Sequence, residues 1–386
     1  MQHYRRIMRA IVLAIIFLLS LALSQMLAAS PPKEAYHWAI PAGLPRPVVP
    51  ADNPMTAPKV ELGRHLFYEK RLSVTGDYSC ASCHEQKRAF TDGRLVGIGA
   101  TGEPHPRNSM SLTNVAYNSV LTWANPLMVR LETQALVPLF GEHPIELGLV
   151  GREAEILTFL RQDPAYRQRF SAAFGAGDDA ITLSNLTKAL AAFERSLISF
   201  NSPYDRYRFG GDRTAISAAA KRGETLFQSE RLECFHCHSG FNFSDSVRHE
   251  RSAFTEVAFH NNGLYNIDGK GAYPPNNTGV YALTQEPTDM GRFKTPTLRN
   301  IALTAPYMHD GSVATLGAAI EHYRVGGRTL TRGQYAGVGS HNPFKSPFVA
   351  GFSLTEAEKQ DLLAFLHSLT DAAFIQNPAL SDPNPP

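Results

Sequence analysis

The feature that most constrains this chain is a pair of five-residue motifs, CASCH and CFHCH, that lie far apart in the sequence. Each motif holds two cysteines and a following histidine, at Cys80, Cys83 and His84 and again at Cys234, Cys237 and His238. C-x-x-C-H is the attachment signature of c-type haem. Two thioether bonds hold the porphyrin against one helical turn, and the histidine reaches the iron as its proximal ligand. The sequence therefore predicts two covalently bound haems, which use all four cysteines of the chain.

Other roles for paired cysteines fit this pattern poorly. A zinc site of this type usually places its two pairs about 15–20 residues apart, whereas Cys83 and Cys234 are 151 positions apart. A thioredoxin-like redox pair gives no reason for a histidine after each motif. Disulfide bonds are compatible with an exported protein, but a bridge within C-x-x-C is strained. We therefore expect haem attachment at both motifs.

Residues 1–29 have the pattern of a secretory signal peptide. Arg5, Arg6 and Arg9 precede an apolar run over 10–23, and small residues follow it. This run is short for a membrane-spanning helix, which needs about 20 residues, although an uncleaved N-terminal anchor is the alternative. We expect export to the periplasm, because c-type haem is attached outside the cytoplasm, and no stable membrane span after cleavage.

The charge of the chain excludes one class of partner. The 386 residues carry a formal net charge of +2, and removing the three arginines of the signal peptide leaves 34 basic and 35 acidic side chains. A nearly neutral mature protein gives no electrostatic reason to bind nucleic acid.

Two segments share a weak internal repeat. Each runs from Gly-x-x-Leu-Phe through Arg-Leu and C-x-x-C-H to Phe, a hydroxyl residue and Asp, at 63–92 and 223–245. At roughly 150 residues per domain, the repeat predicts two haem domains, which we place at 59–205 and 206–350. Residues 30–58 are rich in proline and predict an extended lead-in, and 371–386 form a tail.

The apolar residues recur mainly at helical spacing. This spacing runs through 182–199, Asp163-Pro164 is typical of a helix start, and Ser353 to Glu356 read as a capping box before another helix. Residues 240–292 are dense in Gly, Asn, Pro and Tyr, which predicts a long irregular segment. Long segments of this kind more often have a function than not. No segment alternates with period two. We expect a mainly α protein with two cytochrome c-like haem domains and long irregular loops.

Two haems alone do not make an enzyme. A di-haem electron carrier closes both irons with a second ligand, whereas an enzyme leaves one coordination position open for its substrate. The residues on the far side of each iron decide between these two classes.

One further block supplies a family resemblance. The block RFKTPTLRNIALTAPYMHDG at 292–311, together with the two haem motifs, resembles the bacterial di-haem cytochrome c peroxidases and their MauG-like relatives. The resemblance runs from about Glu61 to Thr370. It implies an open, peroxide-reactive first haem and a helix at 351–370 that packs back on the first domain. Residues 111–126 and 138–148 most resemble the MauG-like enzymes of methanobactin gene clusters, which use peroxide to oxidise a tryptophan on a partner protein.

The resemblance also implies a distal pocket above the first haem, built by Gln134, Pro138 and Glu146. Glu146 would be the catalytic carboxyl group, since cleavage of hydrogen peroxide needs one group that takes a proton from one oxygen and returns it to the other. Read alone, Glu146 is better interpreted as a surface or helix-capping acid, and only its place in the motif favours the catalytic role. Trp123 falls where the family has a tryptophan between the two haems, although its spacing to Gln134 is one residue longer than usual. The alternative is that Trp123 is an ordinary core residue.

The sixth ligand of the second haem separates the subfamilies. The family has a methionine there in simple peroxidases and a tyrosine in MauG-like enzymes, and the alignment places Tyr323 at this position. Met308 is the alternative candidate for the sixth ligand. Tyr323 is also compatible with an ordinary core position that does not bind iron. A tyrosinate stabilises high oxidation states of iron, so a tyrosine-ligated haem stores an oxidising equivalent.

Three other assignments follow from the resemblance. A calcium ion between the haems would be held by Asn114 with the backbone carbonyls of Thr304 and Pro306. His105 lies near the place of a resting-state haem ligand of simple peroxidases, but the match is poor, so we expect a loop residue. His236 is expected to be an exposed edge residue.

Three functions remain open on the sequence. The first is an enzyme that reacts with hydrogen peroxide at an open haem and oxidises a residue of a periplasmic partner protein. The second is a cytochrome c peroxidase that removes peroxide with electrons from a small cytochrome or cupredoxin. The third is a non-catalytic electron-transfer cytochrome with both irons closed.

Overall fold

The structure, a computed structural model, describes residues 36–255 and 257–384. The chain divides into a unit at Met1–His37 and a compact unit at Trp38–Pro386. The predicted signal peptide lies outside the described residues. Within the described ranges, no helix has both the length and the apolar character that crossing a membrane requires.

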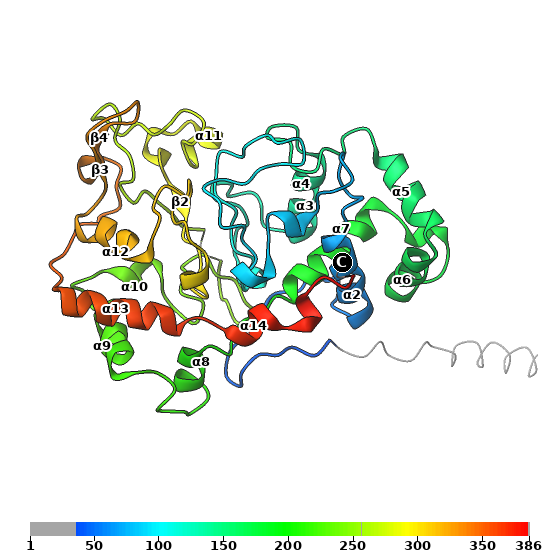
Figure 1. The fold of residues 1–386 in the computed structure, drawn as a ribbon, viewed down its shortest axis with the longest axis horizontal. Coiled ribbons are helices and arrows are strands. Elements are labelled where there is room, and N and C mark those ends of the chain that lie inside the picture. Colours follow the sequence, from blue (N-terminus) through cyan, green and yellow to red (C-terminus); the bar gives the residue numbers. More distant parts are fainter. Residues whose placement is uncertain (1–35, 256, 385–386) are drawn as a thin grey trace, which may run out of the picture. The chain divides into compact units, whose positions relative to one another are not determined.

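The prediction of a mainly α protein is confirmed, since helices dominate and the strands are two residues long (Figure 1). The α-helices are α2 (Ala57–Tyr68), α3 (Leu131–Gln134), α4 (Leu136–Phe140), α5 (Glu153–Gln162), α6 (Pro164–Phe174), α7 (Leu183–Arg195), α8 (Pro203–Arg208), α9 (Ala218–Phe227), α10 (Cys234–Cys237), α11 (Tyr281–Thr284), α12 (Leu316–Arg324), α13 (Glu356–Ser368) and α14 (Ala372–Gln376). Within residues 36–255 and 257–384, the strands form two antiparallel pairs, β1 (Phe259–His260) with β2 (Phe293–Lys294) and β3 (Thr329–Leu330) with β4 (Gly337–Val338).

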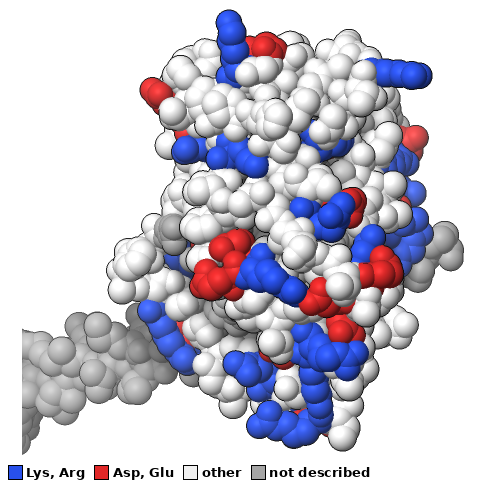
Figure 2. All heavy atoms as spheres, turned by 90° about the vertical axis from the view of Figure 1, so that its left-hand side faces the viewer, with Lys and Arg blue, Asp and Glu red and all other residues white. Residues whose placement is uncertain are grey.

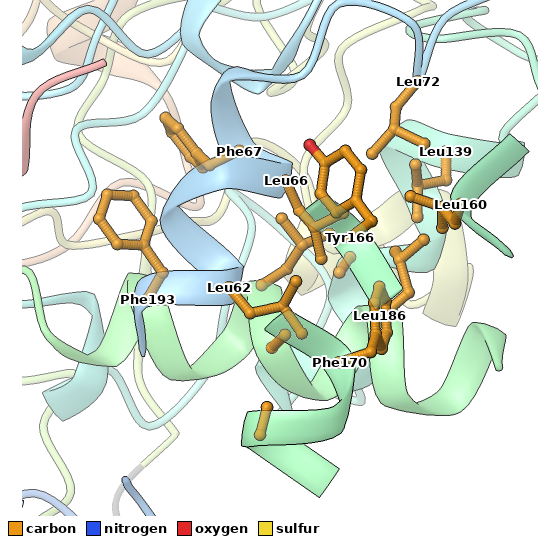
Figure 3. Packing of buried hydrophobic residues seen from close by; sticks show 14 of the residues in the cluster. Leu62, Leu66, Phe67, Leu72, Leu139, Leu160, Tyr166, Phe170, Leu186 and Phe193 are labelled. Atoms are coloured by element: carbon orange, nitrogen blue, oxygen red, sulfur yellow. The ribbon is translucent and has the colours of Figure 1, made fainter. Parts of the chain in front are cut away.

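The first core forms where α2 crosses α7. Gly63 makes this crossing possible, because a Cβ atom at this position would overlap the backbone carbonyl of Ala189. Phe67 and Phe193 then pack with ring centroids 5.1 Å apart. Helix α6 packs on α2, and α5 packs on α6 and adds its apolar side chains to the same cluster, part of which Figure 3 shows. Each fully buried large apolar side chain stabilises the fold by about 1.5–3 kcal/mol.

The second core repeats this crossing with α9 and α13. A Cβ atom on Gly223 would overlap the carbonyl of Asp361, and Phe227 and Phe365 lie 5.2 Å apart. The internal repeat of the sequence is therefore a repeat of helix geometry, with α13 as the counterpart of α7.

This geometry corrects the prediction for the helix at 351–370. The helix packs on α9 in the second core, and the segment that returns to the first core is α14 with the turn after it. Phe374 of α14 packs against Phe90, with ring centroids 5.5 Å apart. The physical reason is that Gly223 has no side chain, so the α13 backbone packs directly against α9 and the helix stays in the second core.

Local signals place most helix starts as the sequence predicts. The Asp163 side chain accepts hydrogen bonds from the backbone of Ala165 and Tyr166 and caps α6. The capping box of α13 is formed by Thr355 and Glu358, two residues later than predicted. The chain from Trp38 to Thr56 is without helix, in agreement with an extended lead-in.

Candidate functional site: two haem pockets and the residue between them

The first haem motif opens onto a cavity of about 1330 Å³, a volume that includes its mouth to solvent. Cys80, Cys83 and His84 all line it. A 3₁₀ turn at Cys80–Ser82 carries the cysteines, and both thiols are free of disulfide bonds. These residues therefore fit a covalently attached haem.

Both proximal histidines are held in the same way. His84 Nδ1 lies 2.8 Å from the Phe90 carbonyl oxygen, and His238 Nδ1 lies 3.1 Å from that of Phe243. This bond fixes the tautomer with Nδ1 protonated and leaves Nε2 as a lone-pair donor for iron. Burial lowers the pKa of both histidines, which favours the neutral form that a metal ligand needs.

Gln134, Pro138 and Glu146 all line the first cavity, as the sequence predicts. Gln134 ends α3, Pro138 lies in α4, and Glu146 follows on the loop after α4. Sequence reasoning undervalued His105, which lines the same cavity with Nε2 3.6 Å from Glu146 Oε1. The loop position was predicted, but no periodicity or motif in the sequence marks the approach of these two side chains.

The first cavity also contains a carboxyl group that the sequence did not single out. Glu194, near the end of α7, lines the wall and is 7% exposed. Its Oε2 atom is buried and has no hydrogen-bond partner among the described residues. Burial raises the pKa of Glu194 to about 8 against the opposing effect of the Arg195 charge.

The second haem motif opens onto a similar cavity of about 1350 Å³. Cys234 and Cys237 begin and end α10, and both line the cavity with His238. Lys294 is buried in its wall, and burial lowers the pKa of this amine to about 8. An anionic haem propionate would compensate for the burial of this cation, so the cavity fits the group.

Both candidate sixth ligands line the second cavity. Tyr323 lies on α12, and burial raises its pKa to about 12. Met308 lies in the preceding loop, where its sulfur accepts a hydrogen bond of 3.3 Å from Asn262 Nδ2. The methionine sulfur therefore already has a protein partner.

Trp123 lines both cavities. Its indole N–H donates a 2.8 Å hydrogen bond to the Asn108 carbonyl oxygen, and its own carbonyl accepts from the Lys294 backbone at 2.8 Å. These bonds fix the ring between the two pockets, where the sequence predicted a relay.

The predicted calcium ligands are not brought together. Thr304 and Pro306 line a small cavity between the haem pockets, but the Asn114 amide binds Ser199 and Asn242 through both of its polar atoms. The asparagine that lines the small cavity with Thr304 and Pro306 is Asn108. Asn108 therefore lies with Thr304 and Pro306 where the sequence predicted Asn114, and the calcium ion itself stays a prediction.

His236 lies at the surface, as expected for a residue between the two cysteines. Its ring stacks on Phe348 at 4.2 Å and its Nε2 atom lies 2.7 Å from Glu233 Oε2. It does not line the second haem cavity.

Comparison with known proteins agrees with this geometry. A family described as di-haem cytochrome c peroxidase matches residues 57–214. The methylamine utilization protein MauG of Methylophilus methylotrophus is 34% identical over 91% of this chain and 93% of that protein. The cytochrome-c peroxidase IdrP1 of Denitromonas iodatirespirans is 35% identical over 85% of each chain.

Solved structures give the same result. A structure described as a MauG-like protein associated with microbial copper homeostasis is 49% identical, with a TM-score of 0.88, over 90% of this chain and 99% of that one. The di-haem peroxidase BthA of Burkholderia thailandensis, at 24% identity and a TM-score of 0.64, shares the fold. Since the relatives are peroxidases and MauG proteins, the third alternative, a non-catalytic electron carrier, is set aside. The chain belongs to the family of di-haem cytochrome c peroxidases and MauG proteins, whose cofactors are two c-type haems.

Proposed function

We propose that this protein is a periplasmic, MauG-like enzyme that uses hydrogen peroxide to oxidise a residue of a partner protein. The observation that carries the proposal is the position of Trp123, which lines both haem pockets and so joins the site of the peroxide reaction to the pocket that contains Tyr323. The 49% identity to a MauG-like structure supports the same assignment.

Haems held by Cys80, Cys83 and His84 and by the second motif would supply the redox chemistry that the reaction with peroxide needs. Glu146 takes the proton from the oxygen nearer the iron and returns it to the leaving oxygen, which then departs as water. His105, 3.6 Å from this carboxyl group, limits the orientations that Glu146 adopts. Gln134 and Pro138 complete the wall and hold the peroxide against Glu146.

Tyr323 is the proposed sixth ligand of the second haem. Its phenolate is an anionic oxygen donor, which favours the oxidised states of iron, whereas a thioether favours Fe(II). The hydrogen bond from Asn262 to the Met308 sulfur supports this choice, because it competes with ligation by that sulfur.

The partner we propose is a periplasmic protein with an oxidisable Trp or Tyr. The relative described as associated with microbial copper homeostasis points to a partner from copper handling. Figure 2 shows Lys, Arg, Asp and Glu side chains intermixed on one face of the molecule, so recognition there rests on local complementarity and not on a field of one sign.

A second candidate function is a cytochrome c peroxidase that draws electrons from a small cytochrome or cupredoxin. Two observations favour it: Met308 lines the second haem pocket, and a relative at 35% identity is a cytochrome-c peroxidase.

The first experiment mixes the fully ferric protein with peroxide in the absence of a reductant. We expect a long-lived oxidised state in the wild type and in Met308→Leu, and its loss in Tyr323→Phe, measured by rapid-mixing absorption and EPR. A requirement for prior reduction, together with loss of activity in Met308→Leu alone, would assign the second candidate function instead.

The second experiment tests the carboxyl group at the first haem. Glu146→Gln should slow the peroxide step by about 10²- to 10⁴-fold, the usual contribution of general acid–base catalysis. Glu142→Gln, an exposed position on the same loop, is the matched control and should react at the wild-type rate. Equal rates for both variants would remove Glu146 from the mechanism.

A further inference from the structure

A line of tyrosines connects the second haem pocket with the surface. Tyr273, Tyr265 and Tyr335 belong to one apolar cluster, which Trp123 also joins. Successive rings are in contact: the centroids of Tyr273 and Tyr265 are 5.4 Å apart, and those of Tyr265 and Tyr335 are 5.8 Å apart. Both pairs are edge-to-face, an arrangement that holds each ring in place.

The inner end of the line begins at the haem pocket. His309 and Phe293 both line the second cavity and stack at a centroid distance of 3.6 Å. Tyr273 lies 6.2 Å from the His309 ring and 6.3 Å from the Phe293 ring. Tyr273 is 3% exposed and therefore lies in the interior of the molecule.

The middle tyrosine has a base for its proton. Tyr265 donates its hydroxyl to Asp310 Oδ2 over 2.6 Å. A phenol loses an electron far more easily when its proton leaves at the same time, and this carboxylate is placed to accept it. The Arg328 guanidinium lies over the Tyr265 ring at 4.6 Å and opposes a positive charge on the ring. Oxidation of Tyr265 therefore requires proton transfer to Asp310.

The outer end reaches the surface at a short hairpin. Tyr335 lies between β3 and β4 and is partly exposed, and residues 331–334, which precede it, are all exposed. The two buried tyrosines are thus followed by one that solvent or another protein reaches.

We infer that Tyr273, Tyr265 and Tyr335 form a relay that carries oxidising equivalents from the second haem pocket to a partner protein docked at the β3–β4 hairpin. This inference rests on the proposed function, which supplies hydrogen peroxide as the oxidant. It identifies the exit from the protein and the surface that the partner contacts.

Each step of the relay transfers one electron. Tyr273, whose hydroxyl keeps its proton in the hydrogen bond to Asn261 Oδ1, loses one electron and becomes a radical cation. Tyr265 returns an electron to Tyr273, and the Tyr265 proton moves to Asp310. Tyr335 then reduces the Tyr265 radical, the proton returns from Asp310 to Tyr265, and Tyr335 releases its own proton to water. An aromatic side chain of the partner finally gives an electron to the Tyr335 radical, which takes a proton back from water. Two passages deliver the two electrons that, with two protons, convert one hydrogen peroxide into two waters.

The test traps the radical at the outer end. The haem-loaded protein is mixed with hydrogen peroxide and the spin trap 2-methyl-2-nitrosopropane, and adducts are located by peptide mass spectrometry. We expect an adduct on Tyr335 in the wild type and its loss in Tyr265→Phe, which keeps the ring but removes the proton donor. Asp310→Asn should also reduce the adduct, because it removes the base.

Tyr281→Phe is the matched control, since Tyr281 lies on α11 outside the cluster, and it should leave the adduct on Tyr335 unchanged. The absorption change of the irons on mixing with peroxide is recorded in every sample. A protein whose irons react while Tyr335 stays unmodified, or whose Tyr335 adduct persists in Tyr265→Phe, overturns the relay and leaves the proposed function standing. Irons that fail to react with peroxide overturn both.

Discussion

Glu194 shows how a single buried group sets the response of this protein to pH. The side chain is buried in the wall of the first haem cavity, and its nearest cation, Arg195, is engaged by Glu132 at 2.7 Å. Burial therefore dominates and raises the pKa of Glu194 to about 8. At neutral pH the folded protein holds a proton that an ordinary glutamate in the unfolded chain has already lost.

The sign of the resulting pH dependence follows from linkage. Between the ordinary pKa near 4.5 and about 8, the folded state binds more protons than the unfolded state, so Glu194 makes stability fall as pH rises. The slope for one proton is about 1.4 kcal/mol per pH unit. Glu194→Gln should reduce the dependence of the thermal-unfolding midpoint on pH between pH 5 and 8, roughly the window that these pKa values define. Glu155→Gln, an exposed position on α5, is the control, and an identical slope in Glu194→Gln and wild type would contradict the assignment.

At the scale of elements, each of the two helix crossings contributes side chains to the wall of one haem pocket. In each, a glycine lets the backbone of a later helix pass, at Gly63 for α7 and at Gly223 for α13. The sequence predicts this duplication through its repeat, and it predicts the apolar face of α13. The partner of α13 was mispredicted because an apolar face does not identify what it packs on, and because Gly223 and Asp361 meet only in the folded chain.

Filling either crossing should weaken the fold. Gly63→Ala and Gly223→Ala each force the helices apart and should destabilise the protein by about 1–3 kcal/mol, the usual cost of overpacking. Gly317→Ala on α12 is the matched control, because its new Cβ atom would meet only the tip of Lys359 at 3.9 Å. The control should be neutral or gain about 0.5–1 kcal/mol from the better helix former. Denaturant unfolding of the three variants measures the difference, and equal stabilities would refute the role of the crossings.

At the scale of the whole molecule, we expect coupling between the pockets to depend on Trp123, because it lines both of them. Trp123→Phe should leave the peroxide reaction of the first haem intact and strongly delay oxidation of the second, followed at separate wavelengths after rapid mixing. Loss of the indole hydrogen bond to Asn108 should cost only about 1 kcal/mol of stability. Leu127→Ala, an exposed position four residues later, is the control. Simultaneous oxidation of both haems in Trp123→Phe would remove the relay role of this tryptophan.

How well the sequence predicts the site depends on how far apart its residues lie along the chain. Haem attachment was predictable because Cys80, Cys83 and His84 are contiguous and the chemistry dictates their spacing. The approach of His105 to Glu146 was not, because each residue lies on its own irregular loop and only the fold brings the two together. The position of Asn108 beside Thr304 and Pro306 was not predictable for a related reason, since one segment contains several asparagines and only the fold shows which of them lines the small cavity.

The bond between each proximal imidazole and a backbone carbonyl has a further consequence. A main-chain carbonyl is the same chemical group whatever side chain its residue carries, so substitutions at Phe90 or Phe243 leave this acceptor in place. Irons bound to His84 and His238 would therefore receive similar electron donation from the two imidazoles. Divergence between the two centres would then be encoded by other residues of the pockets, and we expect Glu146 and Tyr323, which belong to a loop and a helix far apart in the chain, to set it. One centre can then be specialised for peroxide and the other for charge storage without any change in the shared support.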